Sequence, residues 1–342
     1  MAEGEKKPAR SRVVLTGISS RAWEHPADRG ALVALRRLKG FDVVLKAMSG
    51  FMRERAWRLT LLGSSVRVDE RQLSRLHRLL TEAGRSLDVG TLPEMYVQAD
   101  PNLNAMTIGM DRPIIVLSSG LVHHLDDDEL RFVIGHELGH AQSGHALYRT
   151  LLLRLLGLGG LLSALPGGGL AVRVITVALL EWARKSELSA DRAGLLAAQD
   201  PAAALRTQMK LASGGSLEEL DVTSFLAQGA EYDEGGDLRE SLIKFSLLQQ
   251  QTHPFAVVRA TELRRWIDSG AYTQILGGAY PRREDDDEAS VSAAAQEAAA
   301  SYTQQFEGAQ DTLGRLVHDL AGWMGSAKTW LDERFRRGGD EG

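Results

Sequence analysis

The sequence of 342 residues contains no cysteine. This absence excludes disulfide bonds, thiolate metal ligands, iron–sulfur clusters and cysteine nucleophiles, and it fits a reducing compartment. No strong excess of one charge exists either, because 45 Asp and Glu stand against 40 Lys and Arg. The formal net charge of -5 gives no electrostatic reason to expect a nucleic-acid partner. Residues 1–10 are charged and lack the apolar core of a secretion signal, so we expect a cytoplasmic location.

Two nucleotide-binding signatures are also missing. No Gly-x-x-x-x-Gly-Lys-Ser/Thr loop occurs, so the sequence lacks the motor of an ATP-driven protease. The glycines within residues 157–160 do not form a dinucleotide fingerprint, because Leu162 follows them and no strand-like run leads into them. The sequence is nevertheless 44% hydrophobic, which is enough to fill a substantial core.

Apolar spacing predicts a mainly helical chain with one small sheet. Residues 27–83 follow mostly three-and-four spacing, and residues 126–148 begin with an acidic, capped first turn, so both are expected to be helical. Three short strand-like runs lie between them, at residues 94–98, 105–110 and 113–117. Since only turn residues separate these runs, they predict a small antiparallel sheet. The expected fold class is α+β.

The segment His136-Glu137-Leu-Gly-His140 carries the strongest chemical signal. On a helix, residues four apart lie on one face, so His136 and His140 can bind one zinc ion. Glu137 projects about 100° around the helix, where it can reach a water on the metal and act as general base. His145 falls well round the helix from this face and is expected to be structural or capping. The motif therefore predicts a zinc hydrolase.

A third protein ligand is needed, and its identity separates the zinc hydrolases. The class with a third histidine in an extended motif is excluded, because Ser143 and Ala146 occupy the required positions. Peptide deformylases use a cysteine, which is absent. A glutamate from a later helix remains, and Glu187 and Asp191 form the only Glu-x-x-x-Asp pair between the motif and the later acidic run. Glu187 would complete the zinc site, and Asp191 would accept a hydrogen bond from a ligand histidine.

Two further motifs flank these residues. Asn104-Ala-x-Thr-x-Gly109 precedes the histidine pair, and Thr252-His-Pro254 follows the acidic pair. In this order, over about residues 90–265, the four motifs resemble the HtpX-like zinc peptidases. That gluzincin family includes the CaaX prenyl endopeptidases and the mitochondrial quality-control peptidase of the Oma type.

The resemblance implies an active-site helix packed under a small sheet, whose edge strand holds extended substrate. Asn104, Ala105 and Thr107 would border the cleft and hold a peptide by backbone pairing. His253 would stabilise the tetrahedral oxyanion, with Arg259 orienting it. The expected cofactor is Zn2+, and the expected partner is a polypeptide substrate.

An apolar stretch at residues 151–180 departs from relatives that carry clear transmembrane helices. Each of its two arms has about 15 residues, or roughly 22 Å of helix, whereas a bilayer core is roughly 30 Å thick. Because zinc ligands lie on both sides of the stretch, it can cross a membrane twice or not at all. We expect a helical hairpin at about residues 147–186 that packs on the domain or dips into a membrane surface; a buried core hairpin is the alternative.

The sequence accordingly divides into three parts. Residues 1–90 form a polar segment and helical region, and residues 91–282 form a zinc metallopeptidase domain. Residues 283–342 form an acidic low-complexity linker and an amphipathic helix that suits docking on the domain, contact with another subunit or a membrane surface. The resulting prediction is a zinc metalloendopeptidase acting in protein quality control at or near a membrane. The alternatives are an enzyme held latent by its terminal segments and a non-catalytic, zinc-stabilised binding or chaperone-like module.

Overall fold

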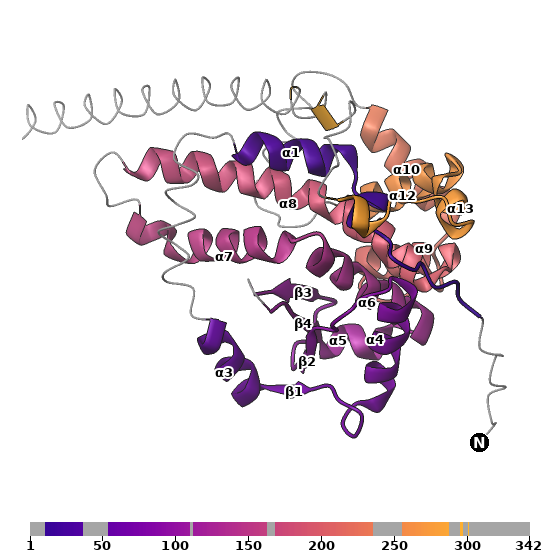
Figure 1. Cartoon of the computed structure of the whole chain (residues 1–342), viewed down its shortest axis with the longest axis horizontal. Coiled ribbons are helices and arrows are strands. Elements are labelled where there is room, and N and C mark those ends of the chain that lie inside the picture. Colours follow the sequence, from indigo (N-terminus) through magenta and orange to yellow (C-terminus); the bar gives the residue numbers. More distant parts are fainter. Residues whose placement is uncertain are drawn as a thin grey trace, which may run out of the picture.

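The computed structural model describes residues 11–36, 54–109, 112–162, 168–234, 255–286, 295, 296 and 300, without the side chains of 54, 157–174, 177, 233 and 234. These residues form a mainly helical structure around one small sheet (Figure 1). The predicted α+β fold class is thereby confirmed. The predicted C-terminal amphipathic helix and His253 lie outside the described residues.

The sheet has four strands in the order β1-β2-β4-β3. They are β1 (Ser65–Arg67), β2 (Glu94–Gln98), β3 (Ala105–Ile108) and β4 (Ile114–Ser118). The expectation of an antiparallel sheet was wrong for one pairing, because β2 and β4 run parallel. All five residues of β4 are buried, so this strand takes the central place, and β3 pairs antiparallel with its outer side. The chain thus reverses twice between β2 and β4. Strand β1 also interrupts the region predicted to be helical.

Along the chain, helices precede and follow the strands, and in space they surround the sheet (Figure 1). They are α1 (Pro26–Arg36), α3 (Glu54–Ser64), α4 (Ser74–Ser86), α5 (Ser119–His124), α6 (Asp127–Gln142), α7 (His145–Leu162), α8 (Gly168–Ala198), α9 (Pro201–Ser213), α10 (Val222–Glu234), α12 (Ala256–Asp268) and α13 (Ala271–Leu276). Short 3-10 turns occur at Ser20–Ala22 and Arg283–Asp285.

The start of α6 has the predicted cap. The Asp126 carboxylate accepts hydrogen bonds from the backbone N–H groups of Asp128 and Glu129, both at 2.9 Å, and the Glu129 side chain accepts one from the Asp126 N–H. This reciprocal arrangement satisfies amides that have no partner inside the helix. The helix ends earlier than predicted, however, because Gly144 adopts a left-handed φ of 69° and separates α6 from α7.

Helix α6 crosses α8 at a contact made of glycine and alanine. A β-carbon at Gly135 would lie 2.3 Å from the Ala197 Cβ, and one at Gly139 would lie 2.5 Å from the Ala193 Cβ. Both distances are far below an ordinary carbon–carbon contact of about 3.5–4.0 Å. The two backbones can approach so closely only because these α6 positions carry no side chain. This approach sets how far any group on α8 lies from α6.

The predicted hairpin corresponds to α7 and α8, which pack side by side (Figure 1). Their described apolar side chains form a buried core with α1. This core includes Leu32 and Leu35 of α1, Leu151 and Leu155 of α7, and Leu179 and Trp182 of α8. Residues 163–167 at the tip lie outside the described residues. Within the described ranges, no helix combines the length and apolar character needed to cross a membrane.

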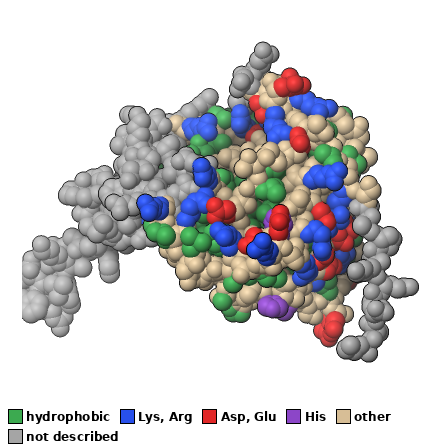
Figure 2. All heavy atoms as spheres, turned by 60° about the horizontal axis from the view of Figure 1, so that its bottom comes forward, with side chains coloured by type: hydrophobic (Ala, Val, Ile, Leu, Met, Phe, Trp, Pro, Cys, Tyr) green, Lys and Arg blue, Asp and Glu red, His purple; other side chains and the backbone are tan. Residues whose placement is uncertain are grey.

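The N-terminal segment packs into the main core ahead of α1. Leu15, Ile18 and Trp23 are buried there among residues of α4, α6 and α8. The Ser19 N–H donates to the Pro281 carbonyl at 3.0 Å, so this segment also meets the end of the described chain. On the face drawn in Figure 2, basic and acidic side chains are interspersed among apolar ones.

Candidate metal centre

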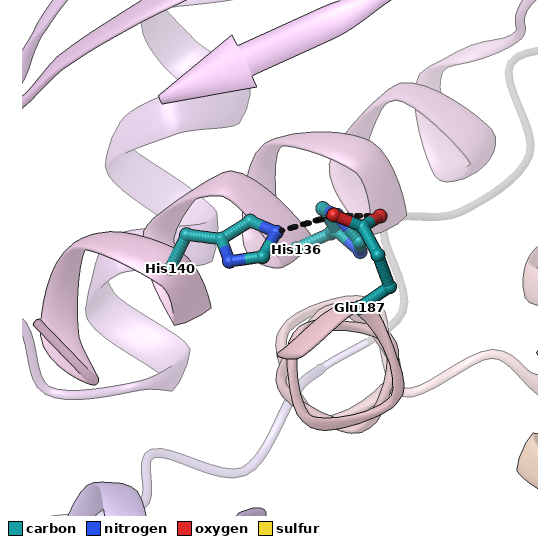
Figure 3. A group of neighbouring side chains, drawn as sticks. All are labelled: His136, His140 and Glu187. Carbon is teal, nitrogen blue, oxygen red and sulfur yellow. Dashed lines mark hydrogen bonds and ion pairs between the residues drawn. The ribbon is translucent and has the colours of Figure 1, made fainter. Parts of the chain in front are cut away.

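The three predicted metal ligands converge at the crossing of α6 and α8. His136 and His140 extend from successive turns of α6, and Glu187 reaches them from α8 (Figure 3). All three are buried, and their ligand atoms lie within 4.8 Å of one another. The His136 Nε2 atom is 3.2 Å from His140 Nε2 and 3.4 Å from Glu187 Oε2, and His140 Nε2 is 3.2 Å from Glu187 Oε1.

These spacings permit a test of whether zinc fits. Ligand atoms at 2.0–2.1 Å from a tetrahedral zinc ion are separated by about 3.3 Å. The two imidazole nitrogens, 3.2 Å apart, agree with that value. Each oxygen of the Glu187 carboxylate lies near one of them, Oε1 at 3.2 Å from His140 Nε2 and Oε2 at 3.4 Å from His136 Nε2. Two imidazoles and one carboxylate are also a donor set found in catalytic zinc sites, which leave a fourth position open. The residues therefore fit a zinc ion in both chemistry and spacing.

Glu137 lies beside the three ligands. Its carboxylate accepts a hydrogen bond from the Thr107 hydroxyl at 2.7 Å, and its Oε1 atom is 3.9 Å from His136 Nε2. Thr107 comes from β3 and is fully buried. The structure thus brings Thr107, which was expected to bind substrate, against the Glu137 carboxylate. Such a bond fixes the orientation of Glu137.

A cavity of about 710 Å³ opens onto these groups. His136, Glu137 and Glu187 line it together with Asn104 and Ala105, the predicted substrate-binding residues next to and on β3. Apolar side chains such as Phe132 and Phe255 form other parts of its lining. Strand β3 ends the described sheet on this side. An extended chain placed along β3 would therefore pass the metal ligands.

Asp191 contacts the first histidine of the motif at the ring nitrogen that faces away from Glu187. Its Oδ1 atom is 3.0 Å from His136 Nδ1. Arg259 donates two hydrogen bonds to the same carboxylate, at 2.6 and 2.8 Å, and its Nη1 atom lies 3.5 Å from Glu187 Oε2. Arg259 was expected to orient His253, whose position is outside the described residues; its described contacts include Asp191, Glu187 and, at 3.3 Å, the Nδ1 atom of His136.

Burial and charge shift the pKa values of both histidines. Burial opposes protonation of His136, but the hydrogen bonds and charges of Asp191 and Glu187 raise its pKa to about 9. Burial and the charge of Arg149 instead lower the pKa of His140 well below its ordinary value. Without a metal, the His136 ring therefore carries protons on both nitrogens at neutral pH. Metal binding at Nε2 displaces one of them.

Sequence reasoning did not single out Arg149. Its Nη1 atom lies 2.6 Å from both His140 Nε2 and Glu187 Oε1, so a guanidinium from α7 contacts two predicted metal ligands. The spacing of residues near Arg149 in the sequence does not indicate this contact, because Arg149 and Glu187 are 38 positions apart and meet only when α7 packs on α8. The same holds for the hydrogen bond between Thr107 and Glu137, whose residues are 30 positions apart.

Comparison with known proteins agrees with this geometry. The profile of Peptidase family M48 matches residues 70–267, more than half of the chain. The chain belongs to this family. The resemblance inferred from the four motifs is therefore confirmed, and all three candidate ligands, together with Glu137 and Asp191, lie within the matched region.

Curated relatives of this M48 family member are named as proteases. Plastoglobule-localized metallopeptidase 48 from the chloroplast of Arabidopsis thaliana is 36% identical over 260 residues, which cover 74% of this chain and 74% of the relative. Protease HtpX of Xanthomonas oryzae pv. oryzae is 25% identical over 241 residues, which cover 61% of this chain and 81% of the relative. No solved structure matches the chain. The family and these relatives together indicate that the chain is a metallopeptidase.

Proposed function

We propose that this chain is a zinc-dependent endopeptidase with His136, His140 and Glu187 as metal ligands. The observation that carries the proposal is the 3.2 Å separation of the two histidine Nε2 atoms, which suits a tetrahedral zinc ion, with a carboxylate oxygen of Glu187 3.2 or 3.4 Å from each. When bound, zinc supplies a Lewis acid that lowers the pKa of a water and polarises a carbonyl.

The chain's own groups would then move the protons. Glu137 accepts a proton from the attacking water and returns it to the leaving nitrogen of the cleaved peptide bond. The Thr107 hydroxyl, 2.7 Å from Glu137 Oε2, holds one carboxylate oxygen and leaves the other beside the metal ligands. Asp191 keeps a proton on His136 Nδ1, so that Nε2 presents its lone pair to the metal. His253 stays our candidate for stabilising the oxyanion.

The substrate is proposed to be a polypeptide in extended form. Asn104 and Ala105 line the cavity at the free side of β3, where backbone pairing would hold a peptide across the site. This mode recognises backbone rather than one side chain, which suits a quality-control peptidase.

We also propose that the protein is cytoplasmic and acts at a membrane or lipid surface. One relative is named for its location in plastoglobules, and α7 exposes Leu153 and Leu156 to the extent of 40% and 46%. Exposed leucines on the face of α7 that lies away from its buried core suit contact with a lipid interface. Flotation of the full chain with vesicles tests this part; a protein that stays in the aqueous fraction contradicts it.

The decisive experiment measures zinc content and casein cleavage on the same purified protein, with and without a chelator, beside Glu137→Gln. We expect one zinc per chain, chelator-sensitive cleavage, and a variant that keeps zinc but loses cleavage. Cleavage by Glu137→Gln at the wild-type rate contradicts the mechanism. Zinc without cleavage in the wild type favours the latent enzyme or the binding module, and trimmed chains that cleave faster distinguish latency.

A further inference from the structure

A second hydrogen-bond chain approaches the metal centre from the N-terminal segment. The Nδ1 atom of His140 is 3.0 Å from Nδ1 of His145, and Nε2 of His145 is 3.1 Å from Oδ2 of Asp28. Each of the three residues is at most 2% exposed. They come from α6, α7 and α1, and Asp28 lies outside residues 70–267, which match the family.

Asp28 is equipped to stay ionised in this buried place. Its carboxylate accepts hydrogen bonds from Trp182 Nε1 at 3.0 Å and from the Ser189 hydroxyl at 2.6 Å. A buried carboxylate with three donors is a fixed negative charge.

The carboxylate dictates where the protons of both histidines lie when a metal is bound. An ionised carboxylate only accepts hydrogen bonds, so His145 Nε2 carries a proton and donates it to Asp28. With a metal on its Nε2 atom, His140 carries its ring proton at Nδ1, so in the 3.0 Å contact His140 Nδ1 is the donor and His145 Nδ1 the acceptor. The remaining nitrogen of His140, Nε2, is left with a lone pair on the side of Glu187 and His136. This is the form that binds a metal.

We propose that Asp28 is a positioning residue of the metal centre, which acts through His145 to fix the tautomer and orientation of His140. This inference rests on the proposed zinc site. The two histidine ligands would thus each have a carboxylate behind Nδ1: Asp191 contacts His136 directly, and Asp28 reaches His140 through one imidazole. The N-terminal segment is then part of the metal centre rather than an addition to the domain.

Zinc affinity of the full-length protein, measured by competition with a chromogenic chelator, tests the relay. Asp28→Asn keeps the size of the side chain but removes its charge, and we expect zinc binding to weaken about 10- to 100-fold. Ser189→Ala is the matched control, because it removes a hydrogen bond to the same carboxylate and leaves the path to His140 intact. We expect its zinc affinity to fall by no more than about threefold, less than in Asp28→Asn, because the charge of Asp28 and its contact with His145 both remain.

A double-variant cycle separates positioning from a general loss of stability. In a His145→Asn background, Asp28→Asn should weaken zinc binding by less than about twofold, because the path from Asp28 to His140 is already cut. Equal losses in both backgrounds, or wild-type affinity in Asp28→Asn, overturn the inference. If Asp28→Asn is unfolded by circular dichroism in excess chelator, His145→Asn alone decides: unchanged zinc affinity overturns the relay, and a loss of tenfold or more supports it. Absence of zinc binding by the wild type would instead contradict the proposed function.

Discussion

Replacing Gly139 by alanine should weaken zinc binding although it alters no ligand. The new Cβ would lie 2.5 Å from the Ala193 Cβ and 3.4 Å from the Ala190 Cα. Because an ordinary carbon–carbon contact is about 3.5–4.0 Å, α6 and α8 must separate locally by about 1 Å. Glu187 stands one turn before Ala190 on α8, so it moves away from both histidines. Zinc sites tolerate deviations of only about 0.2 Å in ligand distances, so we expect zinc affinity to fall at least about tenfold.

The stability of the metal-free protein should change less. Overpacking costs about 1–3 kcal/mol, and alanine returns about 1 kcal/mol through its better helix propensity. The net loss in the free energy of unfolding is therefore about 0–2 kcal/mol. Denaturant unfolding in excess chelator measures this term, and chelator competition measures zinc affinity.

Gly63 provides the matched control for this experiment. It also lies within a helix, but a Cβ there would meet nothing within 4 Å. We expect Gly63→Ala to stabilise the protein by about 0.5–1 kcal/mol and to leave zinc affinity unchanged. If Gly139→Ala binds zinc as tightly as wild type, the close crossing of α6 and α8 does not set the position of Glu187, and the reasoning is refuted.

Three further predictions concern groups around the ligands. Thr107→Val should slow cleavage about 10- to 100-fold at unchanged zinc affinity, because a hydrogen bond to the charged Glu137 is worth about 1.5–3 kcal/mol; steady-state kinetics that match wild type would contradict this. Arg149→Met should tighten zinc binding in chelator competition, since the guanidinium pairs with two ligands in the metal-free protein; weaker binding would argue that it supports the site. Finally, the pKa of His136 is raised to about 9, so zinc must displace a proton from this ring below that pH. The apparent association constant for zinc should therefore rise about tenfold per pH unit between pH 7 and 8.5 and level off above pH 9. A flat profile would show that His136 is already neutral.

Part of the fold followed directly from local pattern. The Asp126 cap and the helical runs were predictable because hydrogen bonding and apolar periodicity act within a few residues. The parallel pairing of β2 with β4 was not, because it depends on which strand is buried enough to take the centre of the sheet. Strand β1 was missed since its three residues pair with a segment about 30 positions away.

The sequence by itself determined the chemistry of the site. A helix places residues four apart on one face whatever surrounds it, so His136 and His140 form a pair, and Glu187 and Asp191 form another. Tertiary structure alone decided that these pairs meet, through the glycine contact of α6 with α8, and that Asp28 contacts His145 and Thr107 contacts Glu137. The physical reason is range: spacing along a helix is a property of the backbone, whereas contacts between distant segments depend on how closely whole elements pack.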